Sequence, residues 1–302
     1  MLTVSNLTKS FGDHVAVDGI SLSIAKGMFY GLLGPNGAGK TTTIQMISSI
    51  LPPDSGKISV DGLGVYAHAS VKMHMGIVPQ EIALYDELTA LENLLFWGNL
   101  YAVHGRTGKD RAAFLLDWVG LADRRHDIVK NYSGGMKRRV NIAAALMHDP
   151  GLIVMDEPTV GIDPQSRNKI YELLDELHHQ GKTILYTTHY MEEAERMCDK
   201  IGIIDKGKII AEGSLDELKK AHAQEENIVI HFTGEAVSKL GNYVISFPEP
   251  QMMTVVTPQA RKRLHDVVQL CTEGGIDITG IDIHDAGLES IFLNLTGRQL
   301  RD

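Results

Sequence analysis

The sequence has little cysteine and no long apolar run, and each lack argues against a class of protein. Of 302 residues only Cys198 and Cys271 are cysteines, and they stand far apart, outside any CxxC spacing. This argues against a disulfide framework or a structural zinc site and fits a reducing compartment. The longest purely apolar runs, such as "LIVM" at 152–155, fall far short of the roughly 18 residues that a spanning helix needs. If the protein works on a membrane, another chain must cross it.

The sequence also lacks a surplus of positive charge and a secretion signal. The formal net charge is −9 and the sequence pI is near 5.8, which disfavours a general nucleic-acid binder. The first residues, "MLTVSNLTKSFG", carry no cationic segment followed by an apolar one, so no signal peptide is expected. We therefore expect a cytoplasmic protein.

The length and the glycine content do carry information. A chain of 302 residues exceeds the size at which one hydrophobic core usually stops growing, so we expect one large domain and a smaller one. The 43% of hydrophobic residues is enough for a real core. The 30 glycines are above the usual share and indicate several tight backbone sites.

Strand and helix patterns predict an α/β fold. Alternating segments in the first sixty residues predict short strands, and Thr41 to Ile50 is predicted to be a helix. The unbroken apolar runs "GLIVMDEP" and "KTILYTTH" are typical of central strands in a parallel sheet, and "KIGIIDKGKIIAEG" predicts a hairpin. A capping box of Thr89 and Glu92 predicts a helix. We interpret "HGRTGKDR", 104–111, as a polar linker to a further helix around 112–119.

The composition changes near "LKKAHAQEEN", residues 218–227, which we interpret as a linker. Beyond it, the segments "NIVIHF", "NYVISF", "MMTVV" and "DITGIDIHD" predict strands, and two helical stretches complete a small α+β domain. We therefore place the main domain at 1–220, with a helical part at about 86–150, and an accessory domain at 221–302.

A phosphate-binding pattern follows the third predicted strand. The stretch "GPNGAGKT", Gly34 to Thr41, fits GxxxxGK[ST] between a strand and a helix. Its glycines let backbone N–H groups ring a phosphate, which the helix N-terminus also attracts. Lys40 would reach the β- and γ-phosphates, and the Thr41 hydroxyl would bind Mg²⁺. The alternative is an ordinary glycine-rich turn.

Two acids and a histidine end the two apolar runs. Asp156, at the tip of a buried strand beside the phosphate loop, is suited to bind Mg²⁺. Because strand side chains alternate, Glu157 should have a different role, which we assign as orienting or deprotonating an attacking water. The alternative is that "DEP" merely starts a turn. His189 becomes a catalytic candidate beside these acids, although a lone histidine is more often a surface or core residue. Gln80, after "GIVP", is a weaker candidate for sensing the metal or the water.

Taken in order, these motifs resemble an ABC transporter ATP-binding subunit over roughly residues 1–220. Phe11 in "KSFG" matches the aromatic residue that stacks on adenine, "GPNGAGKT" matches Walker A, and Gln80 matches the Q-loop. "YSGGM" matches the signature, "LIVMDE" Walker B, "VGID" the D-loop, and His189 the switch histidine. The resemblance implies a P-loop NTPase core with an antiparallel β subdomain and a helical subdomain, which uses ATP and Mg²⁺.

The resemblance also implies a set of site residues. The catalytic residues would be Lys40, Gln80, Glu157 and His189, and the metal ligands Thr41, Gln80 and Asp156. The nucleotide would contact Phe11, Val17, Gly34, Pro35, Asn36, Gly37, Ala38, Gly39, Lys40, Thr41, Thr42, Ser133, Gly134, Gly135 and Asp163.

In that family two cassettes enclose two ATP molecules head to tail, so a homodimer is implied. Ser133 would cap a helix whose N-terminus points at the partner's nucleotide. Gly134 and Gly135 would let the backbone approach phosphate without Cβ atoms in the way. The cations that follow, Lys137 to Arg139, point about 100° apart along a helix, so at most one or two of them could approach the nucleotide. We interpret them instead as a solvated or interface-facing patch.

The last residues, "GLESIFLNLTGRQLRD", resemble the closing segment of ATP-binding subunits from bacterial exporters of the daunorubicin-resistance type. The implied function is ATP hydrolysis that powers a separate permease, at the inner face of the cell membrane. The exported substrate would be a drug, a lipid or another small amphipathic compound. The alternative is a soluble ABC ATPase acting on ribosomes or DNA, which would usually carry two cassettes or a coiled-coil insertion.

Overall fold

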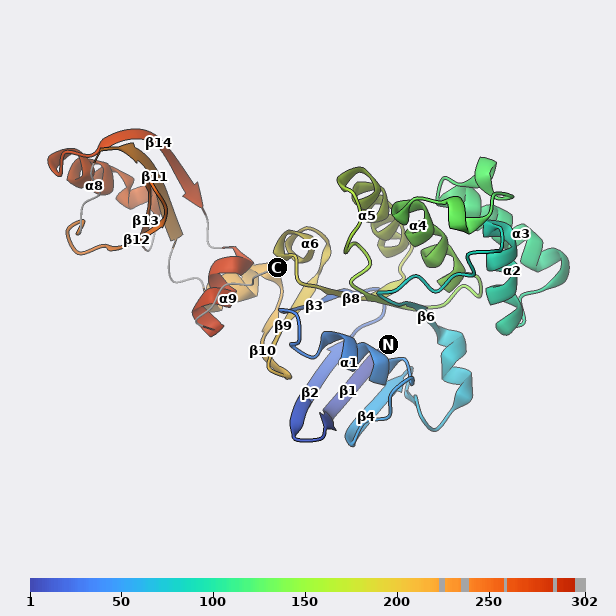
Figure 1. Cartoon of the computed structure of the whole chain (residues 1–302). Helices are drawn as coiled ribbons and strands as arrows, with labels where there is room; N and C mark the ends of the chain where they lie inside the picture. The colour runs from blue at the N-terminus through green and yellow to red at the C-terminus, as the bar shows by residue number, and fades with distance from the viewer. Residues whose placement is uncertain (223–225, 235–238, 258–259, 285–286, 297–302) are drawn as a thin grey trace. The chain divides into compact units, whose positions relative to one another are not determined.

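The computed structural model describes residues 1–222, 226–234, 239–257, 260–284 and 287–296 (Figure 1). This part of the chain divides into two compact units, with the division between Ser214 and Leu215. Within it, no helix combines the length and the apolar character needed to cross a bilayer.

A six-stranded sheet forms the centre of the larger unit, in the order β10-β9-β3-β8-β7-β6. Neighbouring strands from β6 to β9 run parallel, and β9 and β10 form the predicted antiparallel hairpin. The strands are β3 (Phe29–Leu33), β6 (Met75–Val78), β7 (Leu152–Asp156), β8 (Thr183–Thr188), β9 (Lys200–Asp205) and β10 (Lys208–Gly213). The parallel pairing of β7 with β8 confirms the interpretation of the two apolar runs.

Helices cover both faces of this sheet, which explains why its inner strands have no polar face. Helix α1 (Lys40–Ile47) lies on one face, and α4 (Gly134–Ala145) and α5 (Pro164–His179) lie on the other (Figure 1). Leu152 and Val154 of β7 pack into the core with α1, whereas Ile153 and Met155 pack into the core with α4 and α5. The short α6 (Met191–Met197) follows β8.

A second, antiparallel sheet has the order β2-β1-β4-β5 and packs with α1. Its strands are β1 (Leu2–Phe11), β2 (His14–Ile24), β4 (Ser55–Val60) and β5 (Leu63–Gly64), and the 3₁₀ helix η1 (Ala69–His74) leads from it to β6. This sheet is the antiparallel β subdomain that the resemblance implied.

The helical part consists of α2 (Ala90–Leu100), α3 (Gly105–Trp118), the 3₁₀ turns η2 (Ala122–Arg124) and η3 (Val129–Asn131), and α4. The capping box of Thr89 and Glu92 is confirmed at the start of α2. The interpretation of 104–111 as a linker was wrong, because α3 begins at Gly105. Arg111 helps to fix this first half of α3, because its guanidinium donates to the Leu146 carbonyl at 2.9 Å.

The smaller unit is the α+β arrangement that the sequence predicted. Its antiparallel sheet has the order β12-β13-β11-β14, and α8 packs on one face through Val267 and Cys271. Its elements are α7 (Leu215–His222), β11 (Glu226–Thr233), β12 (Val244–Glu249), β13 (Met252–Thr257), α8 (Ala260–Glu273), β14 (Asp277–His284) and α9 (Leu288–Thr296). The predicted linker was wrong at 218–222, which are helical, and at 226–227, which are in a strand. Its residues 223–225 lie outside the described part.

Candidate functional site

The glycine-rich loop, residues 34–39, connects β3 to α1 at the carboxyl end of the central strand. Gly37 and Gly39 have left-handed φ angles of 79° and 106°, which the turn requires. A Cβ atom at Gly39 would lie 2.5 Å from the Ala16 carbonyl oxygen, whereas one at Gly37 would meet nothing within 4 Å. Glycine at 39 is thus needed for packing as well as for conformation, and at 37 the loop surface is open.

The other residues predicted to bind nucleotide differ in exposure. Phe11, at the end of β1, is 52% exposed, and its ring is available for stacking. Val17 is fully buried, and its Cγ2 would lie 3.5 Å from a Cβ atom placed at Gly39. In the loop and at the start of α1, Gly34 and Ala38 are buried, Asn36 is exposed, and Pro35, Thr41 and Thr42 are half-buried.

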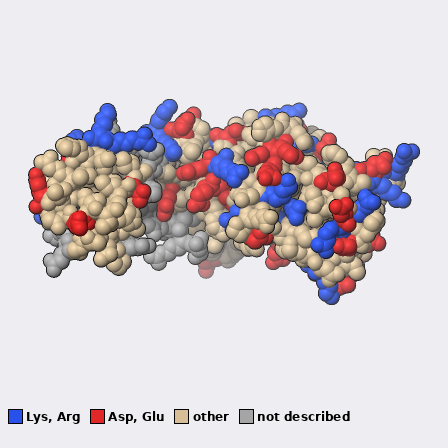
Figure 2. Space-filling view, turned by 90° about the horizontal axis from the view of Figure 1, so that it is seen from above, with Lys and Arg blue, Asp and Glu red and all other residues tan. Residues whose placement is uncertain are grey.

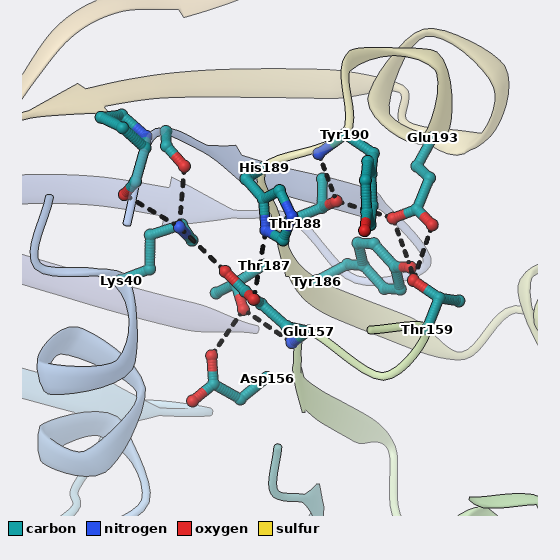
Figure 3. Close-up of polar contacts among 12 residues, drawn as sticks. Lys40, Asp156, Glu157, Thr159, Tyr186, Thr187, Thr188, His189, Tyr190 and Glu193 are labelled. Atoms are coloured by element: carbon teal, nitrogen blue, oxygen red, sulfur yellow. Dashed lines mark hydrogen bonds and ion pairs between the residues drawn. The ribbon is translucent and has the colours of Figure 1, made fainter. Parts of the chain in front are cut away.

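Lys40, Glu157 and His189 form one connected array (Figure 3). Lys40 Nζ lies 2.9 Å from Glu157 Oε1, and Glu157 Oε2 lies 3.2 Å from His189 Nδ1. Lys40 also donates to the carbonyl oxygens of Gly34 (2.7 Å) and Pro35 (3.1 Å). Three residues predicted from separate motifs are therefore brought together, with Lys40 and Glu157 only 4% and 5% exposed.

Asp156 lies beside this array and is held by hydroxyl groups. Thr187 Oγ1 donates to Asp156 Oδ1 at 2.7 Å, and the Thr41 side chain is also hydrogen-bonded to this carboxyl group. Burial raises the pKa of Asp156 above its ordinary value, and these hydrogen bonds partly offset the rise. The desolvated carboxylate is thus paired with the predicted metal-binding hydroxyl of Thr41.

These residues fit a magnesium ion that is shared with a nucleotide. Mg²⁺ prefers oxygen ligands and usually binds one or two carboxylates together with substrate phosphates. Asp156 and Thr41 supply one carboxylate and one hydroxyl in direct contact. Among the described residues no group of three or more His, Cys, Asp or Glu side chains could hold a metal by itself. The chemistry of the donors therefore suits a metal that takes its remaining ligands from phosphate and water.

Glu157 has a backbone conformation that the sequence did not predict. It follows the last residue of β7 with a φ angle of 44°, in the left-handed region that non-glycine residues rarely adopt. Its N–H donates to both the carbonyl (3.2 Å) and the hydroxyl (3.0 Å) of Thr187. This turn directs the side chain to Lys40 and His189, while Asp156 contacts Thr187 and Thr41. The different positions of the two carboxylates agree with the inference that they have different roles.

Gln80 is exposed and follows β6. Its main chain is anchored by Arg138, one of the three cations that were predicted to form a solvated or interface-facing patch. Arg138 is 3% exposed and donates to the carbonyl oxygens of Pro79, at 2.7 Å, and of Gln80. Lys137 pairs with Asp86 at 2.7 Å.

The third cation of the triplet also has a partner in the chain, because Arg139 donates to the Val119 carbonyl at 2.7 Å. The interpretation of Lys137 to Arg139 as a solvated or interface-facing patch was therefore wrong. The three side chains hold loops of the same subunit, and Arg138 joins the signature helix to the loop that carries Gln80.

The signature stretch begins α4. Ser133 is the N-cap, and its hydroxyl accepts from the Met136 N–H at 3.2 Å. Ser133 and Gly134 are exposed, but Gly135 is buried. A Cβ atom at Gly135 would lie 2.2 Å from Ser166 Oγ, whereas one at Gly134 would approach Ile162 Cδ1 only to 3.9 Å. Packing against Ser166 thus requires glycine at 135 within one subunit, a reason that the sequence did not reveal.

Asp163 caps α5 next to this stretch. Its carboxylate accepts from the Ser166 N–H at 2.9 Å, and this hydrogen bond lowers the pKa of Asp163 below its ordinary value. The signature and Asp163 thus form a second group, and within the described chain no hydrogen bond or ion pair joins Ser133 or Asp163 to Lys40 or Glu157. Among the predicted site residues, the Lys40 array with Asp156 and Thr41 is thus one group, and the signature with Asp163 is another.

Comparisons with known proteins match this geometry. The model of the ABC transporter family matches residues 17–160. The linearmycin resistance ATP-binding protein LnrL of Bacillus subtilis is 46% identical over all of both chains. The daunorubicin resistance ATP-binding protein DrrA3 of Streptomyces coeruleorubidus is 36% identical over 99% of this chain and 97% of its own. The Nod factor export ATP-binding protein I of Cupriavidus metallidurans is 39% identical over 100% and 99%.

Solved structures support the same family. The dimeric structure of MJ0796, a bacterial ABC transporter cassette, covers 71% of this chain and 99% of its own, with a TM-score of 0.66 and 30% identity. The dimeric post-hydrolysis state of this cassette, bound to ADP and Pi, has a TM-score of 0.65 at 29% identity, over 71% of this chain and 99% of its own. The chain belongs to the ABC transporter family and is an ATP-binding subunit that hydrolyses ATP.

Proposed function

We propose that this subunit powers the export of a small amphipathic compound through a separate membrane permease, at the inner face of the cell membrane. Support comes from full-length similarity to subunits named for linearmycin resistance, daunorubicin resistance and Nod factor export. A separate permease would supply the membrane crossing, for which no described helix has the length and apolar character. The compound would be selected by the permease.

The observation that carries the proposed chemistry is the array of Lys40, Glu157 and His189. Lys40 and the backbone of the loop at 34–39 would hold the phosphates of ATP. Glu157 would accept the proton of the attacking water, and His189, in contact with the same carboxylate at 3.2 Å, would hold it in position. Mg²⁺, bound by Asp156 and Thr41 with Gln80 as a further ligand, would supply charge stabilisation on the phosphate oxygens.

The second group of residues would act on a partner subunit. Ser133 and Gly134 are exposed at the N-terminus of α4, where backbone N–H groups and the helix dipole favour an anion. No hydrogen bond or ion pair in the described chain joins them to their own Lys40. We therefore propose a homodimer in which the signature of one subunit and Asp163 complete the nucleotide site of the other. The dimeric cassette structure that resembles this chain is consistent with such an assembly.

The alternative, a soluble ATPase that acts on ribosomes or DNA, has less support. Basic and acidic side chains are interspersed over the face of the larger unit, at the right in Figure 2. A nucleic-acid partner would favour a continuous basic field instead. Co-purification with ribosomes or DNA, in place of a membrane protein, would favour this alternative.

Substitution of Glu157 by Gln tests the proposed base. Gln keeps the shape of the side chain but cannot take up a proton, so turnover should fall by about 10²- to 10⁴-fold. ATP should bind more tightly, because the Lys40 ammonium loses the carboxylate that competes with phosphate. Hydrolysis in single turnover and the Kd for ATP are the measurements. Glu172→Gln, at an exposed position on α5, is the matched control. Wild-type turnover in Glu157→Gln would refute the assignment of the base.

The export function needs a separate test. The subunit should co-purify from membranes with a permease, and candidate amphipathic compounds should raise ATP hydrolysis by that complex. Accumulation of the compound in inverted vesicles, dependent on ATP and lost in Glu157→Gln, would identify it as the substrate.

A further inference from the structure

A buried carboxylate outside the motifs is surrounded by hydroxyl groups. Glu193, on α6, is 2% exposed and accepts four hydrogen bonds. Those from Thr159, Tyr186 and Thr188 can be followed in Figure 3. Oε1 accepts from Thr159 Oγ1 (2.6 Å) and Tyr171 OH (2.7 Å). Oε2 accepts from Tyr186 OH (2.8 Å) and Thr188 Oγ1 (2.6 Å). Each oxygen is thus satisfied by two donors, which is what a carboxylate with about four acceptor positions can use.

Strand β8 connects this carboxylate to the Lys40 array through the alternation of its side chains. Tyr186 and Thr188 point to Glu193, whereas Thr187 points to the opposite side and donates to Asp156. His189, the next residue along, contacts Glu157. Alternate residues of one strand end therefore serve two polar clusters on opposite faces.

Glu193 also holds the chain on the far side of Glu157. Thr159 lies two residues beyond Glu157, and its hydroxyl donates to Glu193. Before that turn, the Glu157 N–H is fixed by Thr187. The unusual φ angle of Glu157 is thus held between two anchors, and Glu193 is the acceptor of the second.

A third connection reaches α5. Tyr171 lies on this helix, which begins just after Asp163, and its hydroxyl donates to the same Glu193 oxygen as Thr159. One carboxylate therefore joins the residue before His189, the turn after Glu157 and the helix capped by Asp163. Burial of Tyr171 and its hydrogen bond to Glu193 raise the pKa of the Tyr171 hydroxyl, so this donor keeps its proton.

We propose that Glu193 is a positioning residue for ATP hydrolysis, which orients His189 through Thr188 and Glu157 through Thr159. It touches neither nucleotide nor water, and it acts by fixing two short segments that carry the reacting groups. The proposal rests on the roles proposed above for Glu157 and His189.

Matched substitutions at the two ends of one hydrogen bond test this role. Glu193→Gln keeps the shape but replaces one acceptor oxygen by a donor, and Thr188→Val removes a hydroxyl that Thr188→Ser restores. We expect Glu193→Gln and Thr188→Val to lower the single-turnover rate by about 10- to 100-fold, the range typical of residues that orient catalytic ligands. The Kd for ATP should stay within about twofold, because none of the four hydrogen bonds of Glu193 comes from Lys40 or the phosphate loop. Thr188→Ser should keep the wild-type rate.

Controls separate positioning from a general loss of structure. Glu192→Gln, at the exposed neighbouring position, should behave as wild type. Thermal unfolding of the full-length chain reports folding, and a variant that loses rate and ATP binding together has a structural defect, which would overturn the proposal. A wild-type rate in folded Glu193→Gln would overturn it too. If Glu157→Gln and His189→Ala also keep the wild-type rate, the proposed mechanism itself fails, and these two variants thus distinguish the two failures.

Discussion

At the scale of single residues, the turn at Glu157 combines a proposed catalytic role with a conformational cost. A non-glycine residue in the left-handed region carries strain, which persists only where neighbouring contacts fix it. Two hydrogen bonds from its N–H to Thr187 supply such contacts. The sequence "DEP" gave no sign of this turn, because φ depends on contacts between β7 and β8 that lie 30 residues apart.

Asp156 provides a prediction on pH dependence. Its pKa is raised in the folded protein, so the ionised carboxylate lowers stability at neutral pH, and this cost disappears as the pH falls below the raised pKa. Asp156→Asn keeps an acceptor for Thr187 and removes the charge. Without nucleotide and Mg²⁺, we expect it to stabilise the protein by about 0.5–2 kcal/mol at pH 7, the range common for a single stabilising substitution.

Thermal unfolding of both proteins between pH 7 and pH 4 measures this difference, which should shrink as the pH falls. Mg²⁺-dependent ATP hydrolysis should be lost in Asp156→Asn at every pH. A lower unfolding temperature than wild type at pH 7 would mean that the carboxylate stabilises the fold.

The two signature glycines provide a matched pair for a second prediction. An added methyl group at Gly135 would collide with Ser166, whereas one at Gly134 would make only an ordinary van der Waals contact with Ile162. Gly135→Ala should therefore destabilise the isolated subunit by about 1–3 kcal/mol, the usual cost of overpacking. Gly134→Ala should keep its stability but lower hydrolysis, if a partner's phosphate approaches there.

Denaturant unfolding and ATPase assays separate these effects. Ser166→Gly makes space for the new methyl group and should restore the stability of Gly135→Ala. If it does not, Gly135 is needed for a reason other than this contact.

Some site residues could be predicted and others could not, for a physical reason. Lys40, Thr41 and Asp156 occur in motifs whose spacing along one segment defines the chemistry. Arg138 occurs in a run of three cations, and which of them is buried depends on how α4 packs against the loop after β6. Glu193 has four partners on three separate segments, and no local pattern marks such a residue.

At the scale of elements, α4 and the Gln80 loop are held together by side chains of the helix. Besides Arg138, Asn141 Oδ1 accepts from the Ala83 N–H at 3.3 Å. The segment that carries Gln80 is thus anchored on both sides to the helix that begins at Ser133. Movement of the Gln80 segment should therefore be transmitted to α4, and movement of α4 to the Gln80 segment.

Arg138→Met tests this connection. The substitution keeps a long side chain but leaves the carbonyls of Pro79 and Gln80 without their charged donor, which should cost roughly 2–3 kcal/mol. Lys137→Met, which removes a more exposed ion pair, should cost less than about 1 kcal/mol. Hydrogen exchange of residues 79–83 and the free energy of unfolding are the measurements. Equal protection of this segment in Arg138→Met and wild type would contradict the proposed anchor.

Most elements could be predicted because their apolar periods are local. The strands β7 and β8, the hairpin β9-β10 and the helices α1, α4 and α8 follow from periodicity, turns and caps. The first half of α3 was missed because its sequence is polar, and it is held by contacts such as that of Arg111 with Leu146. The strand order β6-β7-β8-β3-β9-β10 has no local signal, since it depends on crossovers through the helices.

At the scale of the whole molecule, two separate groups of site residues predict that activity needs two subunits. Ser133→Arg should leave ATP binding at Lys40 nearly intact and abolish hydrolysis, and Lys40→Ala should abolish binding in its own subunit. A mixture of the two variants should regain about one quarter of the wild-type rate, because half of the dimers then contain one intact site of two. Equimolar mixing and ATPase assay measure this recovery.

Each variant alone is the control and should stay inactive. Failure of the mixture to recover activity, although heterodimers form, would mean that the signature acts within its own subunit or that both sites must be intact.

The alternation at the end of β8 also has a consequence for how this gene can vary. A single residue inserted within the strand would exchange its two faces. The polar cluster at Glu193 and the one at Asp156 would then both lose the side chains that β8 supplies. A point substitution can weaken one cluster at a time, whereas any insertion or deletion of one residue here would disrupt both clusters. This segment should therefore tolerate exchange of residues far better than a gain or loss of one codon.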